Sequence, residues 1–294
     1  MSALIRLLRP KQWTKNFLVF AAFLFTGDLG SQTHGLQTLL AFFTMCAASS
    51  ATYIANDIAD VERDRRHPKK RLRPIASGEI AVPVAIATSV ALALASIASA
   101  LYLGPIALAL VAIYGIVQVA YNLSLKRIPV ADVFSISMGF VIRAVMGAAA
   151  IQVPISGWLL YCTAALALML GFAKRRQEFI AQSQDLAATR ESLLGYSRSA
   201  LDALVIIFAC SAAVCYGVYS IQSKTAQRNP GLILTSFFVV YGIARYVLLV
   251  FSADEGGEPA DVLFGDPQMI FAIVGFVVTA VIAVSGVPVP LLER

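Results

Sequence analysis

The chain is built from long apolar blocks separated by short polar segments, and this pattern limits its fold more than any other feature. A helix needs about 20 apolar residues to cross a bilayer core about 30 Å thick. The blocks are continuous, whereas the strands of outer-membrane barrels alternate apolar and polar residues. The sequence therefore predicts an all-α, polytopic membrane bundle of nine transmembrane helices. The predicted spans are 17–29, 36–54, 81–103, 106–121, 130–151, 158–172, 201–221, 232–251 and 268–287.

The scarcity of charge supports a membrane protein. Of the 294 residues, 59% are hydrophobic and only 14% are charged, while soluble domains have about a quarter of their residues charged. This composition excludes a soluble two-domain enzyme and a disordered chain. We expect a single transmembrane domain over residues 1–294. Its residues 1–16, in which Leu4, Leu7 and Trp13 alternate with basic side chains, are expected to form an interfacial segment.

The distribution of Lys and Arg predicts the orientation. The formal net charge is +6, from 23 Lys and Arg against 17 Asp and Glu. With nine spans and a cytoplasmic N-terminus, 18 of those 23 basic residues fall in cytoplasmic segments, as the positive-inside rule requires. We therefore expect a protein of the inner cell membrane whose active site faces the cytoplasm, and no nucleic-acid partner. The longest loops, 55–80 and 174–200, are the expected catalytic loops.

Four oxygen-bearing side chains follow one another at the end of the second predicted span: Asn56, Asp57, Asp60 and Asp64. If the helix continues through them, a turn of about 100° per residue places all four on one quarter of its surface. Oxygen ligands without His or Cys favour Mg²⁺, which binds one or two carboxylates together with substrate phosphates. The alternative is a solvated helix end in which Arg63 and Arg65 neutralise the acids.

A basic run follows this acidic group directly. Seven Lys and Arg residues lie between Arg63 and Arg73. Positive-inside topology and attraction to anionic lipid headgroups explain such a run without any substrate. Acidic and basic residues side by side favour a metal site for a diphosphate. The candidates for clamping phosphate are Arg65, Arg66, Lys69, Lys70, Arg71 and Arg73.

Two arginines lie inside predicted spans. An arginine at the bilayer centre costs about 2.5–3.5 kcal/mol, so we expect Arg143 and Arg245 to face a polar cavity or a carboxylate. Simple pairing within the bundle is the alternative. Lys126, Lys174 and Arg175 lie at span ends, and Glu178 could add a second acidic group.

The stretch from Asn56 to Asp64 resembles the N-D-x-x-D-x-x-x-D motif of the UbiA-type intramembrane prenyltransferase superfamily, and the match continues through 71–78. Other motifs resemble one branch of that superfamily, the polyprenyl-phosphate (decaprenyl-phosphate) phosphoribosyltransferases. They are Arg9-Pro-Lys-Gln-Trp-Thr-Lys-Asn16, Leu125-Lys-Arg-Ile-Pro-Val-Ala-Asp132, Lys174-Arg175-x-x-Glu178 and Tyr241-Gly-Ile-Ala-Arg-Tyr246.

The resemblance implies a nine-span fold and transfer of 5-phosphoribose from phosphoribosyl diphosphate (PRPP) to a polyprenyl phosphate, for synthesis of an arabinose-donor lipid of the cell envelope. Diphosphate is released. It implies Mg²⁺ at Asn56, Asp57, Asp60 and Asp64, with Asp60, Asp64 and Lys174 catalytic. The remaining substrate-binding candidates are Lys15, Asn16, Lys126, Arg143, Arg175, Glu178, Tyr241 and Arg245. A homo-oligomer is compatible with this sequence.

One departure from the ordinary prenyltransferases of the superfamily is informative. Those enzymes carry a second motif, D-x-x-x-D, where this chain has Lys174-Arg-Arg-Gln-Glu178. Basic residues there suit a lipid monophosphate as the nucleophile. Two alternatives stay open: a Mg²⁺-dependent prenyltransferase that uses a prenyl diphosphate and a small acceptor, and an ion-coupled transporter or lipid-binding scaffold.

Overall fold

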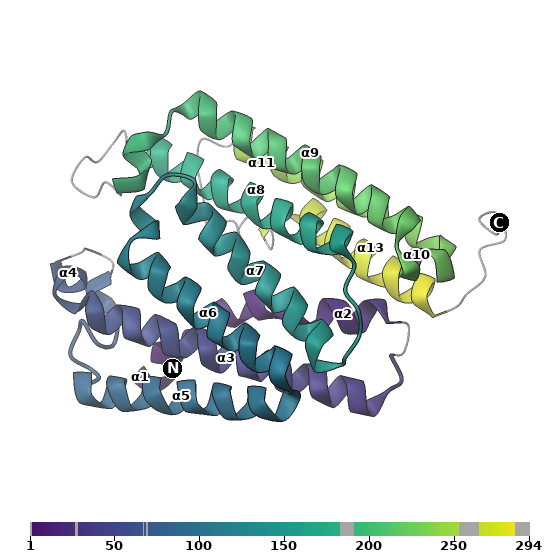
Figure 1. The fold of residues 1–294 in the computed structure, drawn as a ribbon. Helices are drawn as coiled ribbons and strands as arrows, with labels where there is room; N and C mark the ends of the chain where they lie inside the picture. Colours follow the sequence, from purple (N-terminus) through teal and green to yellow (C-terminus); the bar gives the residue numbers. More distant parts are fainter. Residues whose placement is uncertain are drawn as a thin grey trace. The chain divides into compact units, whose positions relative to one another are not determined.

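The computed structural model describes residues 2–26, 29–66, 68, 70–182, 191–252 and 265–285, and within these ranges all regular structure is helical (Figure 1). The α-helices are α1 (Ala3–Leu8), α2 (Phe20–Phe25), α3 (Gln32–Ala59), α4 (Val61–Arg66), α5 (Val82–Leu103), α6 (Pro105–Leu123), α7 (Ala131–Ala150), α8 (Gly157–Gln182), α9 (Arg198–Gln222), α10 (Lys224–Arg228), α11 (Thr235–Ser252) and α13 (Pro267–Val284). The 3₁₀ helices are η1 (Pro10–Val19), η2 (Lys70–Leu72), η3 (Leu125–Arg127), η5 (Glu191–Gly195) and η6 (Pro230–Leu234).

In the described part of the chain, eight helices are long and apolar enough to cross a membrane: α3, α5, α6, α7, α8, α9, α11 and α13. Each overlaps most of one of the last eight predicted spans, so the predicted all-helical multi-pass architecture is confirmed. Among these eight helices, the shortest link joins α5 to α6 through Gly104 alone. Its φ of 120° lies in a region that L side chains rarely adopt, which explains why glycine stands between the two helices.

The first predicted span, 17–29, does not form a continuous α-helix. Its start lies in the 3₁₀ helix η1, and α2 then runs for only six residues. Packing explains the irregular path, because the polar Asn16 and the apolar Val19 of η1 are both fully buried. A ninth crossing is not confirmed. The cytoplasmic location of the N-terminus was inferred together with nine spans, so it also stays a prediction.

The contacts divide the chain into two compact units. Unit 1 contains residues 1–23, 30–123 and 142–153, and unit 2 contains residues 24–29, 124–141 and 154–294. In unit 1, α3 lies along α5, and its core is built around Met45, Tyr114 and Met146. In unit 2, α8 lies along α9, with Phe172 and Met269 in the core (Figure 1). The single domain over 1–294 stays a prediction.

The two expected catalytic loops contain more helix than predicted. In 55–80, α3 continues to Ala59 and is followed by α4 and η2. In 174–200, α8 continues to Gln182, so that Lys174 and Glu178 stand on a helix. Low hydropathy marked position 174 as a loop, but Lys, Arg, Gln and Glu are good helix formers. The expected loop boundary at residue 174 is therefore wrong, and residues 183–190 lie outside the described ranges.

One glycine fixes the approach of η1 to α7 within unit 1. A Cβ atom on Gly147 would lie 1.9 Å from the carbonyl oxygen of Val19. That atom belongs to the backbone and cannot rotate away, so a larger residue must displace the whole segment.

We predict that Gly147→Ala destabilises the protein by about 1–3 kcal/mol, the usual cost of overpacking a core. Thermal unfolding of the detergent-solubilised protein measures this effect. Gly115→Ala is the matched control, because a Cβ there meets nothing within 4 Å and alanine is the better helix former. Equal melting temperatures for the two variants would contradict the prediction.

Candidate active site

The four predicted metal ligands lie where α3 ends and α4 begins; we call them the carboxylate cluster (Asn56, Asp57, Asp60 and Asp64). The helix does not continue through them as assumed, because Asp60 ends α3 with φ −96° and ψ 7°. The continuous helix on which the predicted single face depends is therefore interrupted at Asp60. After this break Asp57 and Asp64 are buried, 4% and 1% exposed, while Asn56 and Asp60 are half-buried.

Arginines neutralise the two buried aspartates. Arg73 donates from one nitrogen to Oδ1 of Asp57 at 3.0 Å and to Oδ2 of Asp64 at 2.5 Å. Arg9 donates to both oxygens of Asp57, at 2.5 and 2.6 Å, and lies over the ring of Tyr53. Hydrogen bonds between two ionised groups are roughly twice as strong as those between neutral groups. Arg9 was missed as a site residue, although it opens the 9–16 motif that supplied Lys15 and Asn16.

Surface ion pairs surround the cluster. Arg63 pairs with Asp60 at 2.8 Å, and Arg65 pairs with Glu62 at 2.7 Å. The pairing that the sequence offered as an alternative to metal binding is thus present at the exposed edge. Such pairs stabilise a protein little, so they leave Asp60 able to exchange its partner.

The donor chemistry of the cluster fits a hard divalent cation. All its donors are oxygen, which suits Mg²⁺. Among the described residues, no three His, Cys, Asp or Glu side chains are gathered as a ready-made metal site. Mg²⁺ does not need one, because it binds one or two carboxylates and takes further ligands from phosphates and water. The half-buried Asn56 and Asp60 are the members of the cluster best placed to receive a metal–diphosphate complex.

The other basic candidates of this region differ in exposure. Lys70 is half-buried in η2, and burial, followed by the charge of Arg73, lowers the pKa of its ammonium group below the ordinary value. Arg66 and Arg71 are exposed, as is Lys15 of η1. Lys69 lies outside the described residues.

Arg143 is buried inside unit 1 among polar groups. Its Nε donates to Oδ1 of Asn16 at 2.6 Å, and a terminal nitrogen donates to the hydroxyl of Tyr114 at 3.2 Å. The amide of Asn16 donates in turn to the sulfur of Cys46 at 3.1 Å. These contacts agree with the expected polar surroundings, and also with the alternative of pairing inside the bundle.

In unit 2, the basic stretch of α8 contains two arginines that are 2% exposed. Nε of Arg175 donates to Oδ2 of Asp132 at 2.8 Å, and its NH1 pairs with Glu178. Arg176 donates to Asp202 at 2.5 Å and to the backbone carbonyl of Val250 at 2.9 Å. The acceptors Asp132 and Asp202 were missed, because they lie 43 and 26 residues away in the sequence.

Lys174 and Lys126 are both half-buried in unit 2, Lys174 on α8 and Lys126 in η3. Arg245 meets a carboxylate, as predicted, since it donates two hydrogen bonds to Asp266 at 2.8 and 3.2 Å. These bonds lower the pKa of Asp266, which also caps α13. Tyr241 donates to Gln268 at 2.9 Å.

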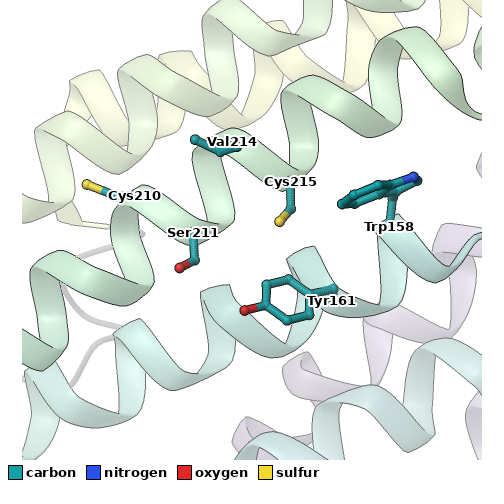
Figure 2. A pocket seen from close by; sticks show the side chains of 6 residues that line it. All are labelled: Trp158, Tyr161, Cys210, Ser211, Val214 and Cys215. Carbon is teal, nitrogen blue, oxygen red and sulfur yellow. The ribbon is translucent and has the colours of Figure 1, made fainter.

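A hollow in unit 2 lies elsewhere, between α8 and α9. It has a volume of about 390 Å³ and is lined by Trp158, Tyr161, Cys210, Ser211, Val214 and Cys215 (Figure 2). A smaller one of about 220 Å³ shares Tyr161. Neither is lined by a predicted site residue, and both linings are mainly apolar. A diphosphate site must therefore be sought among the charged residues.

Comparisons with known proteins agree on one family. The model of the UbiA prenyltransferase family matches residues 17–265. The chain is 33% identical to the decaprenyl-phosphate phosphoribosyltransferase of Mycolicibacterium smegmatis, over 90% of this chain and 87% of that protein. It is 30% identical to the enzyme of that name from Mycobacterium tuberculosis, over 97% and 95%. Its fold resembles a UbiA homolog from Archaeoglobus fulgidus bound to DMAPP and Mg²⁺, with a TM-score of 0.72 and 18% identity, over 98% of this chain and 100% of that one.

We predict that Arg73→Gln destabilises the protein by about 1–3 kcal/mol, because it leaves the buried Asp64 without its arginine. Melting temperatures in detergent measure the effect. Arg65→Gln is the control, since that side chain is half exposed and pairs with an exposed Glu62. Removing the stranded charge in the double variant Arg73→Gln/Asp64→Asn should restore part of the loss. A double variant no more stable than Arg73→Gln would argue against this pairing.

Proposed function

Because the chain belongs to the UbiA prenyltransferase family, we propose that it transfers 5-phosphoribose from PRPP to a polyprenyl phosphate of the decaprenyl type, with release of diphosphate. The observation that carries the proposal is the similarity, over nearly the whole chain, to two decaprenyl-phosphate phosphoribosyltransferases. The chain is thus a membrane-embedded transferase, and its substrates are the proposed part.

The charges on α8 support a lipid monophosphate as the acceptor. Lys174, Arg175 and Arg176 follow one another there, and cations suit a phosphate monoester better than they suit a second metal ion. A polyprenyl phosphate and the 5-phosphate of PRPP are both monoesters. Lys126 in η3 and Lys174 on α8, both half-buried in unit 2, are the proposed ligands of one of them. Lys174 would also stabilise charge during transfer.

We propose that Mg²⁺ enters with the diphosphate of PRPP and is held by Asn56 and Asp60, with Asp57 and Asp64 behind them. When bound, the metal supplies positive charge to the leaving diphosphate. The Archaeoglobus fulgidus homolog is bound to Mg²⁺, which supports this cofactor. Arg73 and Arg9 hold the two buried carboxylates in fixed positions. Lys70, Arg71, Arg65 and Arg66 would donate hydrogen bonds to phosphate oxygens.

The proposed reaction exchanges one C–O bond for another. An oxygen of the lipid phosphate forms a bond to the anomeric carbon of the ribose, and the bond from that carbon to the diphosphate oxygen breaks. Diphosphate leaves with the electron pair. The nucleophile is already an anion, so no side chain has to remove a proton. The protein would act by aligning the two substrates and stabilising the leaving group.

The location of the site follows from its substrates. PRPP is a highly charged, water-soluble donor, while a polyprenyl phosphate stays in the bilayer. The reaction must therefore take place at a membrane surface. The positive-inside rule favours a cytoplasmic location for the basic segment around Arg73, and we propose the cytoplasmic face of the inner membrane.

A labelled-substrate assay tests this function. Purified protein in detergent with decaprenyl phosphate should move radiolabel from the ribose of PRPP into the organic phase, and release diphosphate in equal amount. Asp60→Asn should lower the rate at least about 100-fold, as loss of leaving-group stabilisation does. Glu62→Gln, on the exposed neighbouring acid, should retain activity. Transfer of label from a prenyl diphosphate to a small acceptor, without ribose transfer, would refute the proposal in favour of the prenyltransferase alternative.

Metal removal gives a second prediction. EDTA should abolish ribose transfer, and added Mg²⁺ should restore it, because the carboxylate cluster needs the cation to hold a diphosphate. The melting temperature should rise when Mg²⁺ and diphosphate are added together to the protein, since a bound ligand stabilises the folded state. Full activity after exhaustive chelation would exclude Mg²⁺ as cofactor.

A further inference from the structure

A single carboxylate organises the basic part of unit 2. Asp132 stands in the first turn of α7 and is completely buried. It accepts hydrogen bonds from Nε of Arg175 at 2.8 Å, from Ser192 at 3.1 Å and from Tyr196 at 3.3 Å. The backbone N–H of Val133 adds a bond at 2.8 Å. A buried charge is tolerated only when it is fully paired in this way, so three separate segments are tied to one side chain.

The turn before Asp132 is held in a strained conformation. Val130 has φ 68°, which is a genuine outlier for a β-branched residue. Its backbone N–H donates to the hydroxyl of Tyr196, the same group that donates to Asp132. Burial raises the pKa of Tyr196 to about 12, so the phenol keeps its proton near neutral pH. Strain of this kind persists only where the surroundings over-determine it.

Close packing joins the same two segments at a further point. A Cβ on Gly195 would lie 2.4 Å from the ring of Pro129. Phe172 of α8 contacts the ring of Tyr196, with centroids 6.3 Å apart. One rigid assembly therefore surrounds Asp132. It consists of the turn at 128–131, the segment 192–196 and the end of α8 that topology predicts to be cytosolic.

This assembly carries both lysines proposed to bind a phosphate monoester. Lys126 precedes the strained turn, and backbone bonds from Ile128 to Leu125 and from Asp132 to Ile128 connect them. Lys174 is the neighbour of Arg175 on α8. Arg175 is 2% exposed and bonded to two carboxylates, which suits a group that holds the structure better than one that binds substrate.

Resting on the proposed function, we infer that Asp132 is a positioning residue: through Arg175 and Tyr196 it sets the separation of Lys126 and Lys174, so that the two lysines grip a phosphate monoester of a substrate. The monoester belongs either to the lipid or to carbon 5 of the ribose. Asp132 itself touches no substrate.

The next residue on α8 offers a matched control. Arg176 is as buried as Arg175 and pairs with Asp202 at 2.5 Å. Its remaining contacts are the carbonyl of Val250 and the ring of Phe251 on α11. Among the described residues, this pair therefore ties α8 to α9 and α11 and not to the Lys126 turn. Asp132 is completely buried whereas the side chain of Asp202 is 29% exposed, so the comparison rests on KM and not on the size of the stability loss. A purely structural role for Asp132 would leave the KM values unchanged in both variants.

The test measures KM and kcat separately for PRPP and decaprenyl phosphate. We expect Asp132→Asn to raise the KM of one of the two substrates about ten-fold, with a smaller change in kcat, as loss of a positioned binding group predicts. The substrate affected identifies whose monoester is bound. Asp202→Asn should lower the melting temperature with both KM values unchanged. If Asp132→Asn does not fold, Tyr196→Phe serves instead, with an expected rise of about three-fold.

A double variant checks that Asp132 acts through the lysine. Asp132→Asn added to Lys174→Gln should raise the same KM no further than Lys174→Gln alone, because the two residues belong to one unit. Three outcomes would overturn the inference while the proposed function stands. They are unchanged KM values in folded Asp132→Asn, an equal rise in KM for both substrates, and additive effects on KM in the double variant. Absence of ribose transfer by the wild type would refute the proposed function, and this inference with it.

Discussion

The high cost of an unpaired charge in or near a membrane governs how this protein uses its few charged residues. Each buried or half-buried arginine named here has a polar partner that comes from another segment of the chain. Arg73 joins Asp57 to Asp64, Arg143 meets Asn16, and Arg175 meets Asp132. Since truncating one member of such a pair leaves a buried charge behind, these contacts fix the segments that contain them.

The parts of the fold that depend on hydrophobic length could be predicted from the sequence. Eight apolar blocks each match one long helix, because crossing a bilayer demands a minimum apolar length. The blocks 81–103 and 201–221, for example, agree with α5 and α9 within a few residues. The same reasoning wrongly predicted a continuous helix over residues 17–29. Their conformation depends on the burial of Asn16 and Val19 against other segments of unit 1, which composition does not reveal.

The sequence predicted which acidic residues form the candidate site, but not how they are paired. Spacing identified Asp57, Asp60 and Asp64 correctly as neighbours, since they lie within one short stretch of chain. It could not show that Asp60 ends α3, or that Arg73 and Arg9 neutralise the buried acids. Those pairings span 16 and 48 residues. Asp132 ends the 125–132 motif but was not predicted as a site residue, because its side-chain partners Arg175 and Ser192 lie more than 40 positions away.

The basic residues therefore divide into two groups with different physical roles. Arg73, Arg175 and Arg176 are bonded to carboxylates and hold helices and turns in register. Exposed or half-buried residues such as Arg71, Lys126 and Lys174 stand beside them on the same segments. A phosphate ligand gains most from donors whose positions are fixed before it binds, since less conformational entropy is then lost. The ion pairs that neutralise the buried charges would thus also hold the remaining basic residues ready to bind phosphate. This explains why acidic and basic residues are concentrated together in a chain in which only 14% of the residues are charged.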